Sequence, residues 1–92
     1  MATFLMYGRY SADAIKKISA EHTTEAVKLV QSYGGKIEAM YATLGEHDLV
    51  LVVSLPSVED AMKTSIALAK MTGIAFTTAP AVFVEQFDQL TG

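Results

Sequence analysis

The sequence predicts a single α+β domain over residues 1–92, with the element order β-α-β-β-α-β. Three observations favour it. Short runs of apolar and aromatic residues alternate with two longer segments whose apolar residues recur at helical spacing. A close connection near Gly45 joins two strand-like runs and predicts an antiparallel hairpin. The length of 92 residues is that of one domain.

The first third of the chain predicts a strand and then a helix. Residues 3–10, "TFLMYGRY", are apolar and aromatic and favour a strand. Residues 11–19 form either one helical turn or a loop, in which Ile15 and Ile18 are spaced to contact the core. A helix follows over residues 20–33, with its apolar residues on one side and its charged residues on the other.

The middle of the chain predicts two antiparallel strands. Gly34–Gly35 ends the first helix, because glycine accepts the left-handed backbone of a helix C-cap. Residues 36–44 alternate well enough for a strand, Gly45–Glu46 forms the turn, and residues 47–55 form the next strand.

The last third predicts a helix and an edge strand. Ser57 is a natural N-cap and Gly73 a natural end for the second helix. A strand follows over residues 74–83; Pro80 breaks it or places it at a sheet edge, because proline lacks a backbone donor. Residues 84–92 extend as a short edge strand or turn toward a neighbour. The expected inner side of the second helix contains Val58, Ala61, Met62, Ser65, Leu68 and Ala69.

This order is that of a ferredoxin-like domain, a four-stranded antiparallel sheet with two helices on one face. The strands, however, are apolar on both faces. Val50 and Val52 point to one face, and the residues on either side of them point to the other. We therefore expect a sheet-to-sheet homodimer, or a higher homo-oligomer, because a lone subunit leaves a large apolar face exposed. The other paired faces are Phe4 and Met6 against Leu5 and Tyr7, and Ile37, Ala39 and Tyr41 against Met40 and Ala42.

Composition disfavours several classes of partner. The net charge is −3, and the only adjacent basic pair is Lys16–Lys17, so nucleic acid is not an expected partner. The chain has no cysteine, and no carboxylate spacing joins His22 and His47 in a metal site. The N-terminus has no basic region before its short apolar run, and no segment is apolar enough to span a membrane. A cytoplasmic protein without membrane contact, bound metal or cofactor is expected.

The segment "LGEHD" holds the residues most suggestive of a site. We interpret Gly45 and Asp48 as structural, with Gly45 in the turn and Asp48 accepting backbone N–H groups at the hairpin. His47 is either a solvated residue at the hairpin end or a group that faces a cleft, where a histidine suits proton transfer. His47 is therefore a candidate catalytic residue.

A second set of candidates lies on the predicted strands. Tyr7 and Arg9 share one face of the first strand. An arginine there needs a carboxylate, solvent or an anionic ligand, and the carboxylates considered are Glu38 and Glu85, as an ion pair between subunits. The candidate ligand-binding residues are Tyr7, Arg9, Tyr41, His47 and Thr77, with Thr78 as the alternative hydroxyl.

Three segments resemble the GYD domain family, small bacterial proteins named for a Gly-Tyr-Asp signature. They are "YGRYSADAIKKI", "GGKIEAMYATLGEHDLVLVVSLPSVEDAM" and "TTAPAVF". Gly45 and Asp48 match the signature, whereas His47 stands where the family usually has tyrosine, so no role for a phenol hydroxyl is carried over. The resemblance implies a ferredoxin-like fold of the dimeric α/β-barrel type, and it implies no activity.

Three functions remain open from the sequence. The first is a small-molecule binding module, with a pocket between sheet and helices or between subunits. The second is a cofactor-independent enzyme of the monooxygenase or isomerase type that uses His47, Tyr7 or Tyr41 for proton transfer. The third is a purely structural assembly or partner-binding protein.

Overall fold

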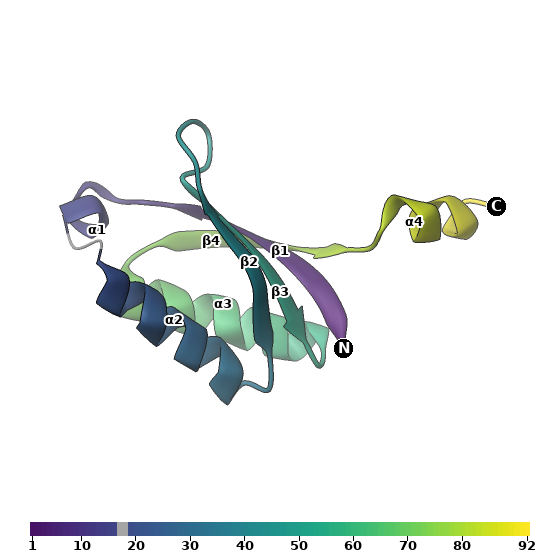
Figure 1. Cartoon of the computed structure of the whole chain (residues 1–92), viewed down its shortest axis with the longest axis horizontal. Coiled ribbons are helices and arrows are strands. Elements are labelled where there is room, and N and C mark those ends of the chain that lie inside the picture. Colours follow the sequence, from purple (N-terminus) through teal and green to yellow (C-terminus); the bar gives the residue numbers. More distant parts are fainter. Residues whose placement is uncertain (17–18) are drawn as a thin grey trace.

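The computed structural model describes residues 1–16 and 19–92. Its centre is a four-stranded sheet in the order β2-β3-β1-β4, and every neighbouring pair is antiparallel. Helices α2 and α3 cover one face of this sheet (Figure 1). The ferredoxin-like order predicted from the sequence is confirmed. The elements are β1 (Ala2–Arg9), α1 (Ala12–Lys16), α2 (Ala20–Ser32), β2 (Lys36–Ala42), β3 (Leu49–Leu55), α3 (Val58–Thr72), β4 (Ala75–Ala81) and α4 (Val84–Leu90).

The two long helices begin and end close to the predicted positions, and the cap of α2 by Ser19 is a feature that the sequence analysis did not include. The Ser19 hydroxyl accepts the N–H of His22 at 3.2 Å, at the start of α2. The Ser57 hydroxyl accepts the N–H of Asp60 at 3.1 Å, at the start of α3. These side chains satisfy N–H groups that have no partner inside the helix. Gly73 ends α3 in the left-handed conformation, with a φ of 73°.

The core lies between the sheet and these two helices. Buried side chains alternate along β1 and β3, while α2 and α3 each present one side. On α3 this side differs from the predicted one: Thr64 is fully buried, whereas Val58 and Met62 are each 60% exposed. Thr64 was missed because it is polar; its hydroxyl donates to the Asp60 carbonyl at 2.7 Å, so burial costs it no hydrogen bond. The core consists of Phe4, Met6, Ala26, Val30, Leu51, Val53, Leu55, Ala61 and Leu68.

A β-bulge at Glu38 changes which residues of β2 share a face. Ile37 pairs with Val53, whereas Ala39 pairs with the next residue, Val52. Ile37 therefore turns toward the helices and packs on the core, and Ala39 and the following odd-numbered residue turn away from them. The expectation that Ile37 and Ala39 share a face is wrong, because strict alternation cannot anticipate one extra residue in the strand.

The hairpin between β2 and β3 is longer than the sequence suggests. β3 begins at Leu49, so residues 43–48 form the connection in place of a tight turn at Gly45–Glu46. Gly45 has a φ of 151°, which favours glycine there. The short segment after β1 does contain the helical turn α1, but its Ile15 is exposed and does not reach the core. Ile18, the other expected contact, lies outside the described residues.

The C-terminal segment is a helix, so the expected edge strand is wrong. β4 ends at Ala81, and α4 then projects away from the sheet and from the other helices (Figure 1). Pro80 does lie on an edge strand, as predicted, since β4 pairs only with β1. Among the described residues, no helix has the length and apolar character needed to cross a membrane.

Candidate functional site

The face of the sheet opposite the helices, here called the open face, carries most of the predicted site residues. Tyr41 of β2 pairs with Val50 of β3, Val50 pairs with Tyr7 of β1, and Tyr7 pairs with Thr77 of β4. Directly paired residues point to the same face, so these side chains form one row across all four strands. Three of the five predicted ligand-binding residues, Tyr7, Tyr41 and Thr77, are brought together in this row.

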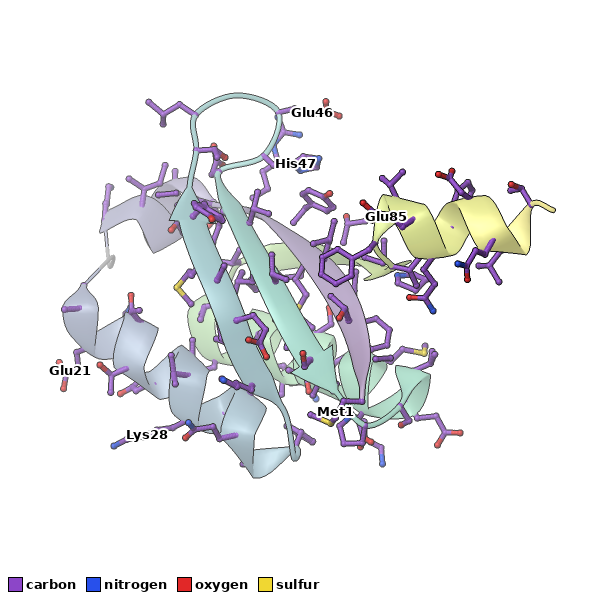
Figure 2. All side chains as sticks on the ribbon, turned by 45° about the vertical axis from the view of Figure 1, so that its right-hand side comes forward. Met1, Glu21, Lys28, Glu46, His47 and Glu85 are labelled. Carbon is purple, nitrogen blue, oxygen red and sulfur yellow. The ribbon has the colours of Figure 1, made fainter. Side chains whose placement is uncertain are left out.

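The hairpin places the fourth predicted residue, His47, beside this row. The rings of Tyr7 and His47 have centroids 4.8 Å apart and planes inclined by 37°. The loop is fixed at this point by a hydrogen bond within it: the Thr43 hydroxyl donates to the His47 carbonyl at 2.6 Å. The Asp48 N–H donates to the Gly8 carbonyl of β1 at 2.9 Å. His47 is therefore held over the open face at the hairpin end of the sheet (Figure 2).

Asp48 has a structural contact that joins the start of β3 to the end of its neighbour β1. One of its carboxylate oxygens accepts the backbone N–H of Tyr10 at 3.1 Å, 38 residues away in the chain. The prediction that Asp48 accepts a backbone N–H group is correct in kind. Its place was wrong, because the donor lies just after β1 and not in the hairpin. Asp48 thus ties the hairpin to the end of β1 and helps to hold His47 above Tyr7.

Arg9 is the last residue of β1, two residues after Tyr7, so it lies on the same open face, and it is exposed. The two carboxylates proposed as its partners lie elsewhere. Glu38 accepts the Ser54 hydroxyl at 3.2 Å and lies 3.9 Å from the Lys36 ammonium group. Glu85 belongs to α4. An ion pair between Arg9 and either residue of a second subunit stays a prediction.

The alternative hydroxyl, Thr78, is not part of the open face. Its side chain donates to the Ser65 hydroxyl of α3 at 3.1 Å, on the helix side of the sheet. Thr77, its neighbour, is exposed on the other side. The structure therefore selects Thr77 as the hydroxyl available beside Tyr7.

A groove at the opposite end of the open face was missed in the sequence. It measures about 740 Å³ and lies between the sheet and the base of α4. Glu38 and Ser54 supply its polar wall, and Phe83 and Gln86 its outer wall. Figure 2 shows Met1, another lining residue, at the end of the sheet away from His47. The signal in the sequence was the helical spacing of apolar residues after residue 82, whereas nothing in the sequence located the bulge at Glu38.

The pocket expected between sheet and helices is small. A cavity of about 70 Å³ there is lined by His22 and Tyr10 among others, whereas organic ligands occupy sites of about 300–1,000 Å³. His22 is an exposed residue whose backbone helps to start α2. The open face is therefore the better candidate site. Within the described parts of the chain, no cluster of three or more His, Asp or Glu side chains is placed to hold a metal ion.

The family model described as the GYD domain matches residues 4–91, nearly the whole chain. The chain belongs to the GYD domain family. Gly45 and Asp48, the residues that resemble the family's signature, lie in the hairpin loop that holds His47 over the sheet. No curated protein matches the sequence.

Two solved structures share the fold of this GYD domain. The leucine response regulatory protein LrpA from Mycobacterium tuberculosis has a TM-score of 0.58 at 10% identity. An AsnC family transcriptional regulator from Agrobacterium tumefaciens has a TM-score of 0.59 at 17% identity. Each alignment covers 88% of this chain and 50% of the other, so the GYD domain spans half the length of these regulators. At such identities the likeness concerns the fold alone.

Proposed function

We propose that this GYD domain is a small-molecule binding module whose cleft forms when the open faces of two copies pack together. The observation that carries the proposal is the row of Tyr41, Val50, Tyr7 and Thr77 with the His47 ring against Tyr7. A few polar groups that converge over an apolar floor are the usual composition of a ligand site.

The rest of the open face supports pairing of two copies. Leu5 pairs with Val52 on one side and with Ala79 on the other, and Val52 pairs with Ala39. These side chains are only half-buried in one chain. A second sheet placed face to face would remove this apolar row from water, as in other two-layer β architectures.

The residues at the hairpin end favour a ligand with an apolar or aromatic body and an acidic group. The rings of Tyr7 and Tyr41 offer flat apolar surface with hydroxyl groups. Arg9, at the exposed end of the same face, suits a carboxylate, which it can bind through two parallel hydrogen bonds. LrpA is named for its response to leucine, a molecule of this chemical class.

The test is a thermal-shift screen of small carboxylic acids, together with native mass spectrometry of the purified protein. We expect at least one acid to raise the melting temperature; a ligand at about 100 times its Kd stabilises the folded state by about 2.7 kcal/mol. Arg9→Gln should remove the shift, and Lys63→Gln, a matched loss of charge on the exposed side of α3, should keep it. A shift that is identical in both variants would contradict the assignment of the site.

A cofactor-independent enzyme is the second candidate, favoured by the contact of the His47 and Tyr7 rings. A histidine beside a phenol can pass a proton to or from a bound molecule. Once a ligand is found, its conversion can be followed by mass spectrometry with the unaltered protein and His47→Ala. Turnover that needs His47 would establish an enzyme. Binding without turnover would support the binding module. If no compound binds, a purely structural assembly is favoured.

A further inference from the structure

The C-terminal segment, residues 82–92, here called the arm, has an apolar side that nothing in the described chain covers. Phe83, Phe87 and Leu90 are 83%, 56% and 72% exposed, and no residue of α4 is buried. Their spacing of four and three residues places them on one side of the helix. Glu85 and Gln89 lie on the opposite side.

A helix this short does not stand alone in water. α4 has seven residues, and no side chain caps its N-terminus. Isolated helices shorter than about 12 residues are marginal even in favourable sequences, because nucleation is costly. An amphipathic helix is normally held by the surface that receives its apolar side. The arm therefore requires a partner surface.

We propose that the arm packs on a second copy of this chain, with its apolar side along the groove at the far end of that copy's open face. This inference rests on the sheet-to-sheet pairing proposed above. The groove suits the arm because Leu5 and Val52 form its floor, and the base of the arm, at Phe83, already forms one wall of it. In a two-fold pair each copy gives its arm and receives the other.

The area available on the sheet supports a role for the arm. Four strands of about seven residues outline roughly 450 Å² per copy, or roughly 900 Å² for a pair. Stable interfaces bury about 1,200–2,000 Å² in total. The two phenylalanines of each arm contribute about 300 Å², which brings the pair to about 1,500 Å². The arms thus supply the area that the sheets alone lack.

The decisive test is a disulfide cross-link between copies. The chain has no cysteine, so only the introduced cysteines can form it. ¹⁵N-labelled Thr3→Cys protein, altered in the groove, is mixed with unlabelled Thr91→Cys protein, altered at the end of the arm so that its apolar side chains stay in place, and oxidised mildly. We expect a disulfide-linked pair of one labelled and one unlabelled chain, identified by mass spectrometry. The comparison mixture uses Met62→Cys, on the exposed side of α3, in place of Thr3→Cys. Efficient linking there, or no linking with Thr3→Cys, would overturn the proposal.

A second measurement separates the arm from the sheet pairing. Phe87→Ser should weaken the dimer at least tenfold in sedimentation, and Gln89→Ser, on the polar side of the same helix, should leave its Kd unchanged. An unchanged dimer in Phe87→Ser would refute the arm contact and leave the sheet pairing intact. A chain that stays dimeric with Val50→Asp, on the open face but outside the groove, would instead refute the sheet pairing.

Discussion

The His47 ring lies against the Tyr7 ring, with centroids 4.8 Å apart, so the hairpin loop and the first strand meet over the open face. The loop is held there by two further contacts, from Asp48 to the backbone of Gly8 and to that of Tyr10. The two residues that resemble the family's signature therefore have structural positions in this chain. Gly45 lies in the loop with a positive φ, Asp48 anchors the loop, and His47, the residue before Asp48, presents a ring to the candidate site.

The ring contact predicts the effect of changing His47. His47→Ala should lower the free energy of unfolding by about 1 kcal/mol, the usual contribution of an aromatic pair. His47→Tyr, which replaces the imidazole with a phenol ring, should keep most of this stability because a phenol ring can make the same contact. Urea denaturation measures both. An unchanged free energy of unfolding in His47→Ala would show that the contact adds nothing to stability.

Asp48→Ala should destabilise the fold by about 2 kcal/mol, because the half-buried carboxylate accepts the Tyr10 N–H and a bond to a charged acceptor is a strong one. Asp48→Asn retains an acceptor oxygen and should lose about half as much. Hydrogen exchange gives a local readout, in which the Tyr10 amide should lose protection in Asp48→Ala. Protection equal to that of the unaltered protein would contradict the assigned bond.

The two sides of α3 predict opposite outcomes for similar truncations. Leu68 is fully buried, so Leu68→Ala should cost about 3 kcal/mol from lost burial and the cavity left behind. Met62 is 60% exposed, and Met62→Ala should change stability by less than about 0.5 kcal/mol. Thermal unfolding of the two variants separates the sides. A large loss in Met62→Ala would mean that the outer side of α3 is buried in an assembly.

Gly35→Ala should be strongly destabilising because the space for a methyl group is missing. A Cβ there would overlap the Leu55 side chain and approach the Ser54 carbonyl oxygen within 2.7 Å. The backbone cannot yield easily, so we expect a loss of about 3 kcal/mol. Gly73→Ala, with open space but a left-handed backbone, should lose only about 1 kcal/mol. The reverse order in chemical denaturation would contradict the packing at Gly35.

The sequence was sufficient for the parts of the fold that local chemistry determines. Ser57 and Gly73 act at the ends of α3 as their side chain and backbone freedom dictate, whereas the Ser19 cap of α2 was not predicted. Alternation along β1 and β3 correctly separated Phe4 and Met6 from Leu5 and Tyr7. Tyr7, Tyr41 and Thr77 were grouped as candidates from the sequence with Thr78 left as the alternative, and the strand pairing brings the first three into one row.

The errors arose where the structure depends on contacts distant in the chain. The bulge at Glu38 reverses the facing of Ile37, and a single sequence gives no period from which to locate it. The donor to Asp48 is Tyr10, which no local rule connects to the hairpin. The helix α4 was missed because the segment of residues 84–90 is short and begins with the β-branched Val84. Phe83, Phe87 and Leu90 nevertheless recur at helical spacing.

The most direct test of the central claim is sedimentation equilibrium at micromolar concentration, with the unaltered chain and Val52→Asp compared at several concentrations. The apolar open face predicts a stable dimer for the unaltered chain, and a folded monomer when an aspartate stands beside Leu5 in the middle of that face. If the unaltered chain sediments as a folded monomer, the proposed dimer is contradicted, and so is the proposed cleft between the two sheets.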